Sequence, residues 1–115
     1  MANIKFDCSL DGFTDNWIEV SERWTNAEAK ALDAAMDGGW ATYIALLKKK
    51  VTRCRLVAGD MVIEDFNDVT EEVIDAMDLV LVGFVGGILQ QAVMRLKSLG
   101  NVSARVSLPQ AAGKN

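Results

Sequence analysis

The stretch LVLVGFVGGIL, residues 79–89, contains no charged residue and decides the expected fold. Apolar side chains continue beyond it along one helical stripe, at three- and four-residue steps: Leu81, Val85, Ile88, Ala92, Leu96 and Leu99. This spacing places them on one side of an α-helix that can face a core. We expect a helix over residues 71–99, or two helices with a bend near residues 77 and 78. Asp68 or Thr70 can cap its start, and Gly100 with Asn101 is expected to end it.

The same segment is expected to be buried by protein and not to span a membrane. The apolar run stops at Gln90 and Gln91 and soon reaches Arg95, which is too short for a bilayer core of about 30 Å. Its apolar surface still exceeds what short neighbouring elements can cover, so we expect a homo-oligomer. Gly83 and Gly87 are predicted helix-packing residues, because glycine lets another backbone approach closely.

Two more helices are predicted before this segment. Thr25 and Glu28 have capping-box spacing, which predicts a helix start at Thr25, and Gly38 with Gly39 predicts its end. A second helix is expected to begin near Trp40. Its apolar positions follow one face: Trp40, Tyr43, Ile44, Leu47, Val51 and Cys54.

Little β structure is expected. A short hairpin is predicted where residues 55–57 and 61–63 flank a turn at Gly59. Residues 4–10 alternate between apolar and polar, as in a half-buried strand or an extended arm. Residues 17–20 lack a clear period and are interpreted as extended or irregular.

The chain is expected to form one mainly α domain. Its 115 residues are 50% hydrophobic and 24% charged, which is the composition of a globular domain. We predict a small helical domain over residues 1–101, with an extended N-terminal segment and a short β-hairpin. Residues 102–115 are mostly small or polar, contain the only proline, Pro109, and are expected to be a flexible C-terminal tail.

The composition argues against several kinds of function. A net charge of −4 does not supply the basic surface that nucleic-acid binding needs. The chain has no histidine, so Ser-His and Cys-His nucleophile pairs are absent, and we expect no enzyme and no catalytic residue. The acidic residues at positions 60–78 lack the spacing of a calcium-binding loop, so we expect no metal and no cofactor.

Cys8 and Cys54 are expected to be buried, reduced thiols, although the sequence also permits a disulfide between them. Residues 1–12 contain no apolar core of signal-peptide length, and the protein is therefore expected to be cytoplasmic.

Protein binding is the function that remains. Trp17, Trp24, Phe84 and Ile88 are the predicted partner-binding residues, since large apolar side chains dominate protein interfaces. Trp40 lies on a helical stripe and is assigned to the core. The basic residues at positions 48–55 are expected to pair with the acidic residues at positions 64–78.

Several segments resemble the small tail assembly chaperones of long-tailed bacteriophages: WIEV at 17–20, the capped helix at Thr25, LLKKKV at 46–51 and VIEDFNDVTEEVIDAMD at 62–78. The resemblance covers most of residues 17–101 and brings no catalytic or binding residues with it. It implies a cytoplasmic, mainly helical, non-enzymatic protein that binds the tape-measure protein while tail-tube subunits polymerise. The alternative is a permanent phage structural protein, a head-tail connector or minor virion component, whose apolar helix is buried in an oligomer.

Overall fold

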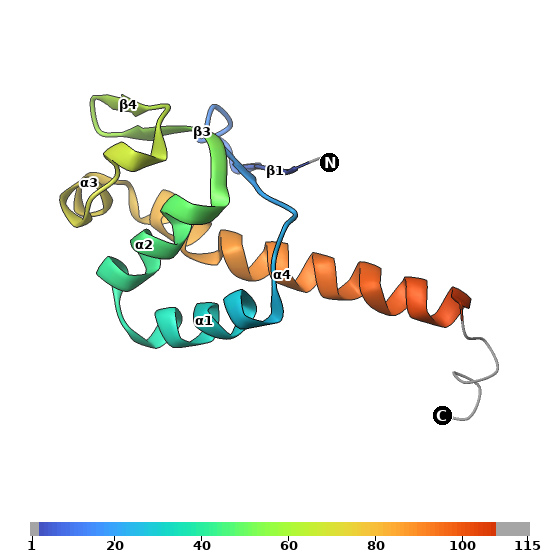
Figure 1. The fold of residues 1–115 in the computed structure, drawn as a ribbon. Coiled ribbons are helices and arrows are strands. Elements are labelled where there is room, and N and C mark those ends of the chain that lie inside the picture. The colour runs from blue at the N-terminus through green and yellow to red at the C-terminus, as the bar shows by residue number, and fades with distance from the viewer. Residues whose placement is uncertain (1–2, 108–115) are drawn as a thin grey trace.

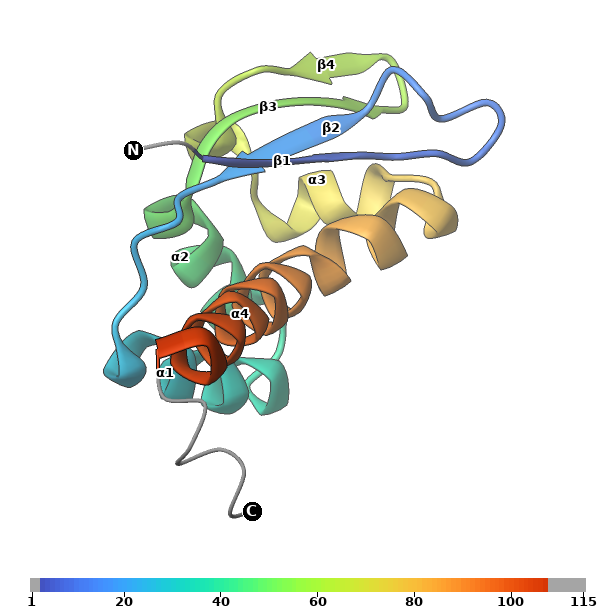
Figure 2. The ribbon, with the colours of Figure 1, turned by 90° about the vertical axis from the view of Figure 1, so that its right-hand side faces the viewer.

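A computed structural model describes residues 3–107 and shows a four-stranded antiparallel sheet with the α-helices on one side of it (Figures 1 and 2). A short 3₁₀ helix precedes α3. The elements in chain order are β1 (Ile4–Asp7), β2 (Trp17–Val20), α1 (Asn26–Asp37), α2 (Trp40–Lys50), β3 (Val51–Ala58), β4 (Met61–Ile63), the 3₁₀ helix (Phe66–Asp68), α3 (Glu71–Ala76) and α4 (Leu79–Ser107).

The sheet contradicts the predicted mainly α fold, because the protein is a mixed α/β structure. The strand order is β1-β2-β3-β4, and each neighbouring pair is antiparallel. Ile4 pairs with Val20 between β1 and β2, and Trp17 pairs with Arg55 between β2 and β3. The expected hairpin is present, turning at Gly59 with φ of 62°, but it forms only one edge of the sheet.

The strand β3 was missed because it follows α2 directly. Val51 and Cys54 continue the apolar spacing of α2, yet the helix ends at Lys50 and the chain becomes extended at Val51. The buried residues of β3 then alternate, at Cys54, Leu56 and Ala58, which is the period of a strand with one face on a core. The helical reading of Val51 and Cys54 was therefore wrong.

The predicted helix starts are confirmed. The Thr25 hydroxyl accepts a hydrogen bond from the Glu28 amide at 3.1 Å, and the Glu28 carboxylate accepts one from the Thr25 amide at 2.9 Å. Thr70 caps α3 in the same way, through the amide of Val73. The bend at residues 77 and 78 is also confirmed, because Met77 is extended between α3 and α4.

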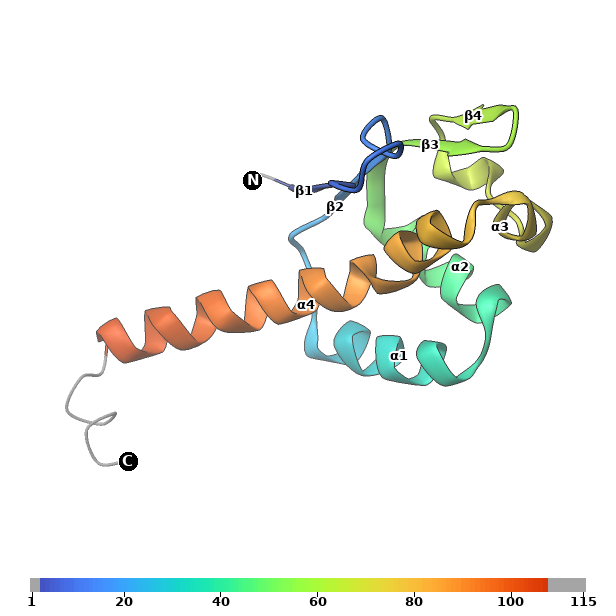
Figure 3. The same cartoon turned by 180° about the vertical axis from the view of Figure 1, so that it is seen from behind.

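The predicted end of the last helix was wrong, because α4 continues through Gly100 and Asn101 to Ser107. Residues 108–115 of the predicted tail lie outside the described residues. The C-terminal part of α4 projects beyond the sheet and α1 (Figures 1 and 3).

The core lies between the sheet and the helices, and α4 runs through its middle, between the sheet and α1 (Figure 2). Its most deeply buried side chains come from both layers: Ile18, Val20, Leu47, Leu56, Val69, Leu81, Val85, Ile88 and Leu89. The Tyr43 hydroxyl crosses from α2 and donates a hydrogen bond to the carbonyl of Val85 at 3.2 Å.

Burial of Tyr43 leads us to expect a loss of stability in alkali. Burial raises the pKa of its phenol to about 12, whereas an unfolded tyrosine titrates near pH ~10. The contribution of the protonated Tyr43 phenol to the free energy of unfolding is therefore complete below about pH 10, and it is lost as the pH rises toward 12. Urea unfolding at about pH 8 and about pH 11 should show a smaller alkaline loss in Tyr43→Phe than in the wild type. Equal losses in the two proteins would contradict this role for the phenol.

Candidate functional site

The four predicted partner-binding side chains lie in different parts of the fold and do not form one site. Trp17 belongs to β2 and Trp24 to the connection between β2 and α1, while Phe84 and Ile88 are both on α4. Trp17 alternates with the fully buried Ile18, so its side chain lies on the outer face of the sheet, away from the helices.

The outer face of the sheet carries balanced charge around Trp17. The Trp17 ring centroid lies 4.7 Å from Lys5 Nζ and 5.2 Å from Arg53 Cζ, so two cations contact the ring. Ion pairs cover the same face: Lys5–Asp7 at 3.7 Å, Arg53–Glu19 at 3.7 Å and Arg55–Glu64 at 3.2 Å. The last of these confirms, for one pair, the expected match between the basic and acidic segments.

Ile88 lies in the core of the protein, where its side chain is 1% exposed and offers no surface to a partner. Phe84 is partly buried and packs against the core. Ile88 follows Leu81 and Val85 on the buried stripe, whereas Phe84 sits at the margin of that stripe.

Over residues 79–94, the side of α4 that faces away from the core is uncharged. We call it the outer face of α4, and its residues are Leu79, Val80, Gly83, Gly87, Gln90, Gln91 and Met94. Large apolar side chains on it are well exposed, with Leu79 at 83%, Met94 at 64% and Val80 at 40%. Among the described residues this is the longest uncharged surface on any helix.

The glycines of α4 have different surroundings. A methyl group added at Gly83 would have no neighbour within 4 Å, and one at Gly87 would reach only Gln91 Nε2 at 3.9 Å. A methyl group at Gly86 would instead lie 3.6 Å from the Trp40 ring. Gly86 is therefore the glycine of α4 that faces Trp40 within the chain, although a methyl group there would make only an ordinary contact. The predicted packing role of Gly83 and Gly87 stays a prediction about another chain.

An apolar pocket, the Trp40 pocket, opens where the turn between α1 and α2 meets α4. Its volume is about 160 Å³, and it is lined by Ala35, Met36, Gly39, Trp40, Tyr43 and Gly86. Gly39 has φ of 85°, a conformation that favours glycine and reverses the chain at the pocket mouth. Met36, 46% exposed, forms part of the rim, and the Trp40 ring packs edge-on against Tyr43 at a centroid distance of 5.6 Å.

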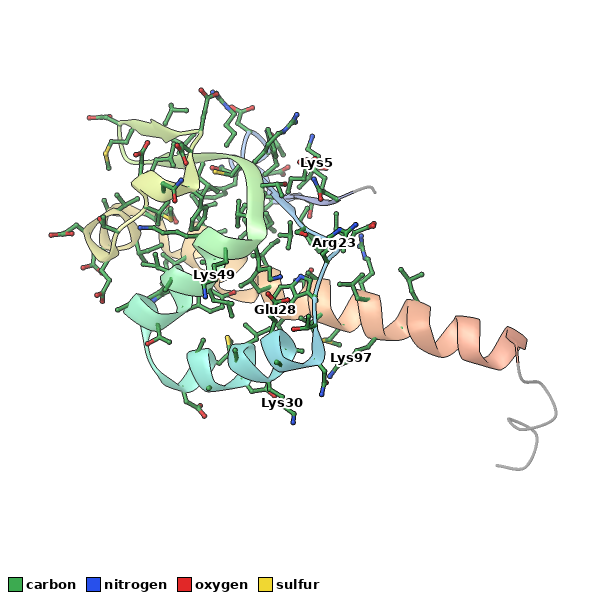
Figure 4. The ribbon with its side chains drawn as sticks, viewed as in Figure 1. Lys5, Arg23, Glu28, Lys30, Lys49 and Lys97 are labelled. Atoms are coloured by element: carbon green, nitrogen blue, oxygen red, sulfur yellow. The ribbon has the colours of Figure 1, made fainter. Side chains whose placement is uncertain are left out.

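A cluster around Lys50 fixes the connection between β2 and α1. Lys50 is 6% exposed, and its Nζ donates to the Arg23 carbonyl at 2.7 Å and pairs with Glu28 at 2.8 Å. The same ammonium lies 4.8 Å from the Trp24 ring centroid, and the Trp24 indole donates to the Ser21 carbonyl at 3.0 Å. Figure 4 shows Arg23 and Glu28 at this junction. Trp24 therefore has a structural role in this cluster.

The Glu28 carboxylate accepts hydrogen bonds from both Lys50 and the Thr25 amide. The hydrogen bond from Lys50, followed by that from the Thr25 amide, holds the pKa of Glu28 below its usual value. Because the folded pKa is lowered, this contribution to stability is present above the unfolded pKa of about 4.3 and is lost as the pH falls through the folded pKa. The carboxylate is therefore ionised at neutral pH and caps α1 as an anion.

Both cysteines are buried and free, as one of the two sequence interpretations predicted. Burial, with the nearby charges of Asp65 and Glu64, raises the pKa of the Cys54 thiol to about 11. Cys54 is thus a protonated thiol at neutral pH and a poor nucleophile. Within residues 3–107, no three histidine, cysteine or acidic side chains come together to hold a metal ion.

Helix α4 extends well beyond the short apolar run at residues 79–89. The segment Leu79–Leu99 has 21 residues, and an 18-residue window within it has a mean hydropathy of 1.7, which is enough, by length and composition alone, to cross a membrane. The sequence argument from insufficient length was therefore wrong. The core helix of a soluble protein satisfies the same two criteria, and one stripe of α4 is buried against the sheet and α1.

Two surfaces for a partner thus stand out among the described residues: the Trp40 pocket and the outer face of α4. Apolar side chains, amides and glycines make up most of both, which suits protein contacts. A scan of the chain against protein-family models and searches of curated proteins and of solved structures found no match.

Proposed function

We propose that the protein is a non-enzymatic assembly chaperone that binds the tape-measure protein of a long-tailed bacteriophage in the host cytoplasm. The resemblance of most of residues 17–101 to tail assembly chaperones supports this assignment. The observation that carries it is the Trp40 pocket, an apolar pocket of about 160 Å³ with an exposed methionine on its rim. An apolar cavity of about 150 Å³ can hold a benzene-sized group, so one large client side chain fits this pocket.

The pocket suits a temporary complex with an elongated client. Burying one large apolar side chain contributes about 1.5–3 kcal/mol, so a single pocket holds its client weakly. The flexible side chain of Met36 can adapt to client side chains of different shape. Many copies of the protein can occupy successive apolar side chains of one tape-measure chain. Tail-tube subunits that bind the same chain more tightly can then displace them.

The test is a pair of matched methionine substitutions. Met36 lies on the rim of the Trp40 pocket and Met61 on β4, and each is 46% exposed. Met36→Glu places a charge at the pocket, and it should weaken binding to the tape-measure protein of the same phage about tenfold, or ~1.4 kcal/mol. Met61→Glu should bind like the wild type. Isothermal titration calorimetry measures both, and failure of the wild type to bind would reject the proposal.

The alternative, a permanent structural subunit of the virion, is favoured by the exposure of the outer face of α4. In a ring or lattice, that face would be covered by a neighbouring subunit. Quantitative mass spectrometry of purified virions separates the two functions. Presence in the infected cell together with absence from the particle supports the chaperone, while a fixed copy number per particle supports the structural subunit and rejects the chaperone.

A further inference from the structure

We propose that α4 pairs with α4 of a second copy of the protein, in an antiparallel crossing centred near Gly87. The contact would bury the outer face of α4 in a two-fold symmetric dimer. This inference concerns the protein alone and does not depend on the identity of a client.

The distribution of charge favours a second copy of the protein as the partner that covers the outer face of α4. In a two-fold contact the same surface meets itself, so any charge on it comes close to a like charge. Residues 79–94 contain no charged side chain. The other described α-helices carry exposed charges: Lys30, Asp33 and Asp37 on α1, Lys48 and Lys49 on α2, and Glu71, Glu72 and Asp75 on α3. In a protein of net charge −4, α4 is the described helix that two copies can share without such repulsion.

Charges at the two ends of this face set the direction of the crossing. Asp78 immediately precedes α4, and Lys97 follows the uncharged face, where it lies beside the start of α1 (Figure 4). An antiparallel crossing at Gly87 brings residues at equal distances before and after Gly87 opposite each other. Asp78, nine residues before Gly87, then lies near Lys97 of the other copy, ten residues after it, whereas a parallel crossing would place like charges together.

The same crossing also brings uncharged residues of the two copies opposite each other between Asp78 and Lys97. Val80 comes opposite Met94, which pairs two exposed apolar side chains. Gly83 comes opposite Gln91, and the open space beside Gly83 leaves room for the longer amide side chain. Small residues at the crossing let the two backbones approach closely, so the flanking side chains can touch. A single helix pair is smaller than a standard interface of about 1,600 Å², so we expect micromolar affinity.

Sedimentation velocity between about 2 and about 200 μM tests for the dimer at concentrations that bracket such an affinity. The wild type should pass from monomer to dimer. Gly83→Glu should weaken dimerisation roughly tenfold or more, because it places a carboxylate in the contact. Ala45→Glu adds the same charge on the exposed side of α2 and should leave the dimer unchanged. A wild type that stays monomeric throughout, or equal effects of the two substitutions, would overturn the proposal.

The fold of the Gly83→Glu protein can be checked separately. Glutamate at this position enters open space and has a better helix propensity than glycine, so the melting temperature should not fall. A monomer that melts at or above the wild-type temperature therefore attributes the lost dimer to the contact itself. A monomer that melts well below it would instead contradict the open position of Gly83.

Cross-linking tests the direction of the crossing. Mixing Val80→Cys protein with Met94→Cys protein under oxidising conditions should give mainly the mixed disulfide dimer. Cys8 and Cys54 are buried and do not compete in the native protein. A predominance of Val80→Cys homodimers would indicate a parallel crossing and would refute the antiparallel one.

Discussion

Replacing Ile88 with alanine is expected to lower the free energy of unfolding by about 2–5 kcal/mol. The Ile88 side chain is 1% exposed and lies on the stripe of α4 that faces the core. Removing its outer atoms leaves a cavity that the surrounding sheet and helices can fill only in part. Urea denaturation of Ile88→Ala measures the loss.

Gly83→Ala is the matched control on the opposite side of the same helix. An added methyl group at Gly83 meets no neighbour within 4 Å, and alanine has the better helix propensity. This variant should therefore gain about 1 kcal/mol. An Ile88→Ala protein that unfolds at the wild-type urea concentration would place the core of the protein elsewhere.

Lys50→Met is expected to destabilise the protein by about 1–3 kcal/mol, because it removes the charged donor of a partly buried hydrogen bond. Lys50 Nζ is the side-chain donor to the Arg23 carbonyl, and methionine keeps the apolar stem but not the donor. Glu28 loses its ion pair as well, but its side chain is 37% exposed and can be rehydrated. Most of the loss should therefore come from the Arg23 carbonyl.

Lys49→Met provides the comparison, because Lys49 is exposed on the same helix. Its effect on the free energy of unfolding should stay within about 0.5 kcal/mol. Guanidinium unfolding of the two variants should separate them clearly. Equal midpoints would mean that the Lys50 cluster does not stabilise the connection between β2 and α1.

Local signals predicted where the helices begin and where the hairpin turns, but they did not predict the sheet. The capping box of Thr25 and Glu28 and the turn at Gly59 depend on residues close in sequence, so their spacing is sufficient. The strand β2 is short, and its place in the centre of the sheet depends on β1 and β3, which are distant or hard to recognise. Val51 and Cys54 fitted a helix equally well until their strand partners were known.

The candidate site was only partly predictable for the same reason. The sequence identified an apolar helix with glycines, but which of its sides is buried depends on where the sheet and α1 pack. Gly86, and not Gly83 or Gly87, therefore meets Trp40 within the chain. The interpretation of Trp24 as an anchor missed its contact with Lys50, since the two residues are far apart in sequence.

The position of α1 and α2 between two neighbouring strands also determines the order in which the protein can fold. The β3–β4 hairpin closes through the turn at Gly59, and β1 pairs with β2, the next strand in the chain. Pairing β2 with β3 requires closure of a loop that contains both helices, which costs more chain entropy and slows folding. Packing α1 against α2 shortens the distance that this loop must span. We therefore expect the sheet to assemble from two hairpins that join after the two helices have packed.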